Sequence, residues 1–89
     1  MGKDILSGLE EKSRVSLGLT KAEAGVFRLV GAGMSNDAIA AKLFVSLGTV
    51  RTHLKSIYKL IGSSDRYSIV SIWFTFLADQ GKIDGGENG

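Results

Sequence analysis

The chain of 89 residues contains no cysteine and a single histidine. The absence of cysteine excludes disulfides and thiol chemistry, and one histidine is too few for an ordinary zinc site. No apolar run approaches the roughly 20 residues needed to span a bilayer, and the N-terminus lacks the apolar core of a signal peptide. These absences predict a cytoplasmic protein that needs no membrane, no metal and no cofactor.

Size and charge narrow the class further. The length allows one domain near the lower size limit for a self-sufficient core, where dimerisation would add stability. The net charge is only +2, but residues 38–66 hold five basic side chains against one acidic one. Positive charge is therefore concentrated in the central segment, as expected of a nucleic-acid footprint.

Residues 46–62 predict an amphipathic helix with two opposed faces. The basic face spans about 100° of a helical wheel, and no acidic residue interrupts it. An ordinary solvated lysine face is the plain alternative, but such a face normally carries interspersed Glu or Asp. An apolar stripe on the far side is suited to burial. The basic face consists of Gly48, Arg51, Thr52, Lys55 and Lys59, and the apolar stripe consists of Val50, Leu54, Ile57 and Ile61.

Two shorter helices are predicted before this one. Thr20 and Glu23 have the spacing of a capping box, which predicts a helix start, and the Gly-Ala-Gly sequence of residues 31–33 predicts its end. Ser35 is placed to cap the next helix, and Ser46 is placed to cap the central one. Two short helices joined by a tight turn, with alanine in the first to allow a close crossing, are typical of a helix-turn-helix.

A last helix is predicted over residues 66–80, with Gly81 as its stop. Its apolar arc is about 200° wide, whereas one core-facing stripe needs only a little over 100°. Two interpretations stay open. Its aromatic residues could all belong to the core, or the helix could self-associate through Ile72, Trp73 and Phe76, because exposed aromatic patches are poorly tolerated unless paired.

The two ends of the chain carry weaker signals. Residues 1–18 are interpreted as a linker or a loosely attached helix, of the kind that connects to an upstream domain, because glycine and serine interrupt their few apolar residues. Residues 82–89 are predicted to be a disordered tail. The ordered domain is therefore expected to span residues 19–81.

Short motifs follow one another in fixed register along the ordered part: Leu19-Thr20 with Glu23, Gly33-Met34-Ser35-Asn36, Ile39-Ala40 with Leu43, Ser46 with Gly48-Thr49-Val50, Thr52-His53-Leu54, Ile57-Tyr58, and Gly62 with Arg66. Together they resemble the LuxR-type (GerE/FixJ-like) helix-turn-helix domain over roughly residues 19–73. The resemblance implies an all-α, four-helix domain that regulates transcription. Its third helix would enter the major groove of DNA, and its fourth would form a dimer interface.

The resemblance also implies roles for individual residues. Arg51, Thr52 and Lys55 take the base-reading positions: Arg51 could pair with guanine, Lys55 could reach guanine or phosphate, and the Thr52 methyl could pack on thymine. The expected partner is double-stranded DNA with an inverted-repeat site, bound by a homodimer. The implied backbone contacts are Ser35, Asn36, Ser46, Thr49 and Lys59.

Departures from the family pattern leave a second hypothesis open. Lys21-Ala22 and Gly25 stand where the family usually has residues of an intramolecular ion pair, Leu47 stands where many members have Glu, and the last helix is unusually aromatic. The chain could instead be a protein interaction module or anti-regulator that binds another regulatory protein through Leu47 and the aromatic helix. An enzyme is not predicted, because His53 lies beside the apolar stripe without a nucleophile elbow or metal cluster.

Overall fold

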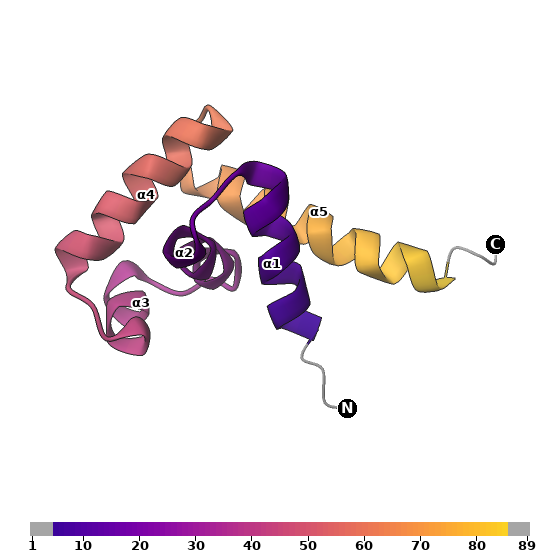
Figure 1. Cartoon of the computed structure of the whole chain (residues 1–89), viewed down its shortest axis with the longest axis horizontal. Coiled ribbons are helices and arrows are strands. Elements are labelled where there is room, and N and C mark those ends of the chain that lie inside the picture. The colour runs from indigo at the N-terminus through magenta and orange to yellow at the C-terminus, as the bar shows by residue number, and fades with distance from the viewer. Residues whose placement is uncertain (1–4, 86–89) are drawn as a thin grey trace.

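The computed structural model describes residues 5–85 of the chain. These residues form helices joined by short connections, with no strand among them, which confirms the predicted all-α class (Figure 1). The helices predicted from Thr20 onward correspond to the last four of the five that the described residues form. The helices are α1 (Ile5–Leu17), α2 (Lys21–Gly31), α3 (Asn36–Leu43), α4 (Leu47–Ile61) and α5 (Arg66–Gly85).

Side-chain caps begin α2, α3 and α4, as the sequence predicts. The capping box of α2 is complete, since the Thr20 N–H donates to Glu23 Oε1 at 2.9 Å and the Glu23 N–H donates to Thr20 Oγ1 at 3.1 Å. Ser35 and Ser46 each accept the backbone N–H three residues further on, at 3.2 and 3.0 Å. Each such cap stabilises its helix by about 1 kcal/mol, because it satisfies an amide that has no partner within the helix.

Residues with positive φ follow each of the first four helices, beginning with Gly18 after α1 at φ +72°. Gly33 follows α2 with φ +90°, and Gly62 follows α4 with φ +73°, a region where glycine carries no steric penalty. Phe44 ends α3 in the same region, with φ 59°, which non-glycine residues adopt only rarely. The predicted apolar turn between α3 and α4 is therefore a strained one, and its Phe44 side chain is 93% exposed.

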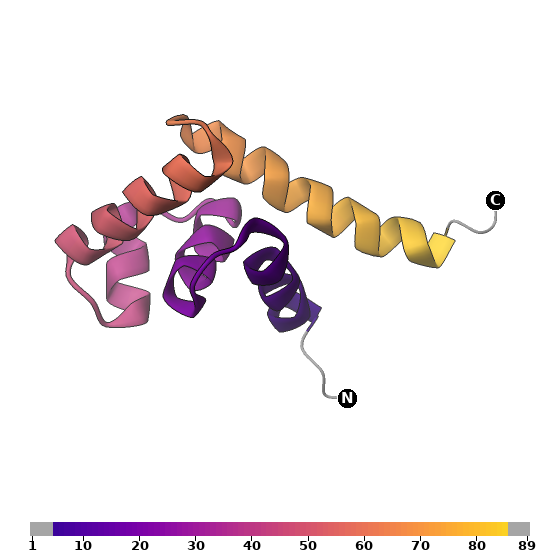
Figure 2. The same ribbon diagram turned by 45° about the horizontal axis from the view of Figure 1, so that its top comes forward.

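Helix α2 lies at the centre and packs against each of the other four helices. Figure 2 shows α4 and α5 spreading apart from their shared connection, with the remaining helices beneath them. The largest fully buried side chain is Phe27 of α2, and every helix contributes to one continuous apolar cluster. Its members are Leu9, Leu19, Ala24, Val26, Phe27, Leu29, Val30, Ile39, Ala40, Val50, Leu54, Ile57, Ile69 and Trp73.

The segment interpreted as a linker or loosely attached helix forms α1, which is anchored on the core. Leu9 is only 2% exposed, and buried Ser13 donates its hydroxyl to the Leu9 carbonyl at 2.8 Å. Glu10 pairs with Arg28 of α2 at 2.6 Å, beside the space where Gly25 carries no side chain. Helix α1 thus brings a carboxylate to the part of α2 where the family's usual ion pair is missing.

Helix α5 runs beyond its predicted end at Gln80 and continues through Gly81 to Gly85. One glycine inside a helix costs about 1 kcal/mol, which is too little to stop a long helix on its own. The predicted disordered tail therefore begins with helical residues, and its residues 86–89 lie outside the described part of the chain. No helix among the described residues combines the length and the apolar character that crossing a membrane requires.

Candidate nucleic-acid interface

Helix α4 has the two faces that its sequence predicts. Val50 and Ile57 are fully buried, and Leu54 is 5% exposed, so the apolar stripe is fixed against the rest of the domain. Arg51 and Lys55, by contrast, are exposed on the opposite side. The packing of the stripe therefore determines which way the basic face points.

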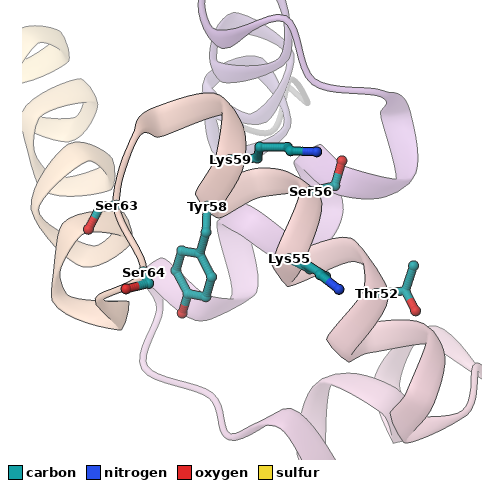
Figure 3. A pocket seen from close by; sticks show the side chains of 7 residues that line it. All are labelled: Thr52, Lys55, Ser56, Tyr58, Lys59, Ser63 and Ser64. Carbon is teal, nitrogen blue, oxygen red and sulfur yellow. The ribbon is translucent and has the colours of Figure 1, made fainter.

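An open hollow lies along this basic face, between α4 and the loop that follows it (Figure 3). Two lysine side chains and several hydroxyl groups line it, and no acidic side chain does. A shallow, open surface of this kind suits an extended polyanion better than an enclosed small molecule. The lining residues are Thr52, Lys55, Ser56, Tyr58, Lys59, Ser63 and Ser64.

The start of α4 is open for approach by a partner. Ser46 caps it and also donates its hydroxyl to Thr49 Oγ1 at 3.0 Å. The first turn contains no acidic residue, and Gly48 is exposed. The partial positive charge of a helix N-terminus therefore faces outward here without a carboxylate to neutralise it.

The start of α3 holds the other two predicted backbone-contact residues. Ser35 is exposed and acts as the cap, while Asn36 is half-buried at the first helical position. Arg66, at the start of α5, donates to Asn36 Oδ1 at 2.7 Å and to the Met34 carbonyl oxygen. Sequence reasoning assigned Arg66 no role in the site, because no local pattern indicates a contact between residues 30 positions apart.

Glu23 connects the start of α2 to α4. Hydrogen bonds from the Thr20 backbone N–H and from the Ser56 hydroxyl hold the pKa of the Glu23 carboxyl below its usual value, against the opposing effect of burial. The charge of half-buried His53 lowers the same pKa slightly. His53 therefore lies close enough to the Glu23 carboxyl to interact with it electrostatically.

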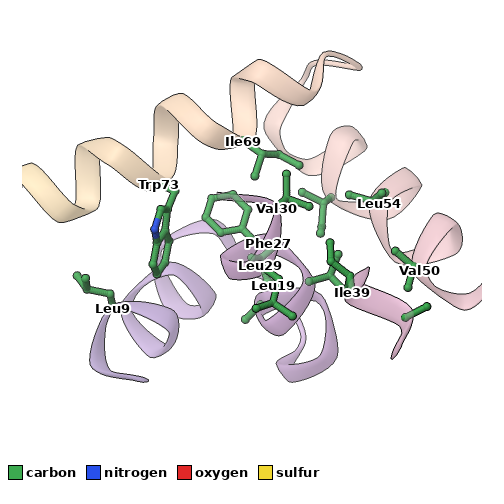
Figure 4. Packing of buried hydrophobic residues seen from close by; sticks show 14 residues of the cluster. Leu9, Leu19, Phe27, Leu29, Val30, Ile39, Val50, Leu54, Ile69 and Trp73 are labelled. Atoms are coloured by element: carbon green, nitrogen blue, oxygen red, sulfur yellow. The ribbon is translucent and has the colours of Figure 1, made fainter. Parts of the chain in front are cut away.

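The residues predicted to form a dimer interface lie in different environments. Trp73 is 3% exposed, and its ring meets Phe27 edge-on with centroids 6.2 Å apart. Figure 4 shows the Trp73 indole between Leu9 of α1 and Phe27 of α2. Trp73 is thus a core residue, as one of the two interpretations of the aromatic helix had it, while Ile72 and Phe76 are half-buried at the margin of the core.

Trp73 also lies directly against the backbone of α2 at Gly31. A Cβ atom on Gly31 would lie 2.6 Å from Trp73 Cβ, closer than real carbon atoms approach each other. Glycine at position 31 is therefore what allows the indole to fit between the helices.

A different strip of α5 is open to solvent. Tyr67 is 78% exposed and Phe74 is 58% exposed, and half-buried Val70 and Leu77 lie next to them on the helix. These four residues recur at alternating spacings of three and four, the spacing of a helix-pairing seam. The hypothesis of a protein interaction module also named Leu47, at the start of α4. The structure shows that this residue is half-buried.

Metal binding finds no support in the described part of the chain. No three or more His, Asp or Glu side chains between residues 5 and 85 come together in a way that could hold a metal ion.

Comparison with known proteins identifies the family to which the chain is similar. Residues 17–73 match the family described as bacterial regulatory proteins, luxR family. An HTH-type transcriptional regulator of Mycobacterium bovis is 44% identical over 66 residues, which cover 71% of this chain and 8% of that protein. The nitrate/nitrite response regulator protein homolog of Haemophilus influenzae is 36% identical over 56 residues, covering 63% of this chain and 27% of that protein.

The transcriptional regulator MalT of Serratia proteamaculans is 38% identical over 52 residues, covering 58% of this chain and 6% of that protein. The chain thus spans only a small part of the length of these relatives. No solved structure matches it significantly. The family match covers more than half of the chain and coincides with the helix-turn-helix of α3 and α4 and its supporting helices. This protein therefore belongs to the luxR family of bacterial regulatory proteins.

Proposed function

We propose that this domain binds double-stranded DNA sequence-specifically and acts as a regulator of transcription in the cytoplasm. The observation that carries the proposal is the exposed face of α4, which presents Arg51, Thr52 and Lys55 without any acidic neighbour on that face. The buried stripe on the opposite side holds the helix rigidly enough to enter a major groove as a unit. The family match supports the same function.

The proposed contacts divide into two classes. Arg51 donates a bidentate pair to guanine, Lys55 reaches guanine or phosphate, and the Thr52 methyl packs on thymine. The remaining contacts go to the phosphate backbone, where they fix the register of the helix but read no sequence. The backbone contacts are Ser35 and Asn36 at the start of α3, and Ser46, Thr49 and Lys59 on α4.

The active form in this proposal is a homodimer that pairs through α5 and binds an inverted repeat. Two copies related by a two-fold axis place two recognition helices on successive half-sites. The strip of Tyr67, Val70, Phe74 and Leu77 supports pairing by its spacing and by the exposure of Tyr67 and Phe74. Ile72 and Phe76 would lie at the edge of such an interface, and Trp73 would support it from the core.

The test is selection of bound sites from a pool of random duplexes at near-physiological salt, where non-specific phosphate binding is weak. An enriched inverted repeat is expected, and its half-site spacing reports the two-fold symmetry. Sedimentation of the protein with and without Phe74→Ser then tests the α5 strip. Folded protein that enriches no sequence would overturn the proposal.

A second candidate is a protein interaction module that uses this scaffold without reading DNA. The exposed Phe44 side chain on the strained turn favours it, together with Tyr67 and Phe74 on α5. Charge reversal of Arg51 and Lys55 would leave such an activity intact, whereas Phe44→Ser, which lies outside the α5 strip, would abolish it. The reverse pattern is expected if the domain reads DNA.

A further inference from the structure

Arg66 joins the starts of two helices that lie far apart in the sequence. Its guanidinium donates to Asn36 Oδ1 at 2.7 Å and also to the Met34 carbonyl oxygen. These two acceptors flank Ser35, the residue that caps α3. One side chain of α5 thus holds both sides of the α3 N-terminus.

The chemistry of this contact fixes the orientation of the Asn36 side chain. A guanidinium has only donor groups, so Asn36 must turn its oxygen toward Arg66. Its Nδ2 group is then left on the other side with two N–H donors, and none of the hydrogen bonds described for residues 5–85 uses them. We propose that Arg66 is a positioning residue, which holds Asn36 so that this amide donates to a DNA phosphate.

Arg66 is itself held in place by its own loop. Asp65 caps α5, accepting the Tyr67 N–H at 3.0 Å, and Ser63 accepts the Asp65 N–H at 3.1 Å. The hydroxyls of Ser63 and Ser68 meet at 2.8 Å across the same turn. The start of α5 is therefore a rigid support from which Arg66 reaches α3.

The two hydrogen bonds of Arg66 go to neutral acceptors. Neither salt bridge found among the described residues involves Arg66. Asp37 lies in the first turn of α3, and Asp65 directly precedes Arg66 in the chain, so the guanidinium is not an isolated positive charge. Arg66 can therefore act on a phosphate in front of α3 through the Asn36 amide, without contacting the phosphate itself.

This inference rests on the proposed DNA binding, and a double-mutant cycle tests the two separately. Affinity for a duplex carrying the selected site is measured over a range of salt concentrations for the wild type, Arg66→Met, Asn36→Ala and the double variant. Each single variant is expected to weaken binding about tenfold, the effect of one hydrogen bond to a charged group. The double variant should lose no more than either single one, because both break the same contact.

Salt dependence separates positioning from direct contact. If Arg66 acts through Asn36, the slope of log affinity against log salt stays at the wild-type value in Arg66→Met. If Arg66 touches a phosphate itself, the slope falls by about 0.9 and the two losses multiply to about a hundredfold, which overturns the proposal. Arg14→Met is the matched control, since it also removes one arginine, from an exposed pair on α1, and should bind like the wild type.

Asn36→Asp tests the donor without weakening the fold. Its carboxylate still accepts from Arg66 and suits the first turn of a helix, but it meets the phosphate with negative charge. Thermal unfolding should match the wild type while affinity falls more than tenfold, and unchanged affinity would contradict the proposed donor. A wild type that prefers no duplex would instead refute DNA reading itself, whatever the variants do.

Discussion

The helix-turn-helix of α3 and α4 and the packing of α5 on α1 and α2 are specified over different distances along the chain. The caps of α3 and α4 join residues three positions apart, and the basic face of α4 follows from its helical period. By contrast, α5 is seated by Trp73, which meets Gly31 and Phe27 more than 40 positions earlier. The first region presents charge to solvent, and the second supplies the stability that holds it in place.

Because one region supplies stability and the other presents charge, substitutions in the two regions should have different effects. Substitutions in the packing of α5 should lower the free energy of unfolding and leave sequence preference intact wherever the protein remains folded. Substitutions on the basic face of α4 should do the opposite, because those side chains are exposed and make no core contact.

The largest effect is expected for Trp73→Ala, which should lower the free energy of unfolding by about 3–5 kcal/mol, the range for deleting a buried aromatic side chain. The loss is a large fraction of the total stability of a small domain. Chemical denaturation measures it. Phe74→Ala is the neighbouring control, and because Phe74 is 58% exposed its loss should be below about 1 kcal/mol. Equal losses for both variants would contradict the core position of Trp73.

Gly31→Ala should destabilise the domain by about 1–3 kcal/mol, although alanine is normally the better helix residue, because its methyl group overlaps the base of the Trp73 side chain. Gly8→Ala in α1, where an added Cβ meets nothing, should instead stabilise by about 0.5–1 kcal/mol. Chemical denaturation of the two variants tests this opposite sign. Two changes of the same sign would show that α2 and α5 do not approach as closely as described.

On the basic face, Lys55→Ala should reduce binding to the selected site by about 1–3 kcal/mol and relax the preference at one base position. Lys59→Ala should weaken all duplexes alike and flatten the salt slope by about one unit. Competition binding against single-base variants of the site distinguishes the two. A uniform loss for Lys55→Ala would rule out base reading by this residue.

The smallest effect is the pH dependence that Glu23 provides. Because hydrogen bonds lower its pKa in the folded state, its stabilising contribution is present above the unfolded glutamate pKa of about 4.3 and is lost as the pH falls through the folded value. Between pH 6 and pH 3, the wild type should lose more stability than Glu23→Gln, which keeps the cap but does not titrate. Parallel denaturation curves for the two proteins would contradict this role.

Features that depend on residues three or four positions apart could be predicted from the sequence. The capping box of Thr20 and Glu23 and the two faces of α4 follow from spacings of three and four residues, and the structure contains them. Anchoring of α1 through Leu9 and Glu10 was not predicted, because its partners lie in α2 and α5. A helical wheel places Trp73 in the apolar arc of α5, but it does not show whether the side chain is buried or exposed. Its burial depends on the space that Gly31 leaves in α2.

The same limit applied to the site. The exposed residues of α4 could be placed from periodicity, and the resemblance added the starts of α3 and α4. The contact of Arg66 with Asn36 joins residues 30 positions apart, and it exists only because α5 begins beside α3. The end of α5 was missed for another reason, since a single glycine weakens a helix without stopping it.

The most direct test of the central claim is the ratio of affinities for the selected duplex and a scrambled duplex, measured for the wild type and for Arg51→Ala/Lys55→Ala at one salt concentration. A ratio of about 10³ or more is expected for the wild type. In the double variant the ratio should fall toward one while the unfolding temperature stays unchanged. A wild-type ratio near one, or a ratio that survives the loss of both side chains, would contradict the claim that the basic face of α4 reads DNA.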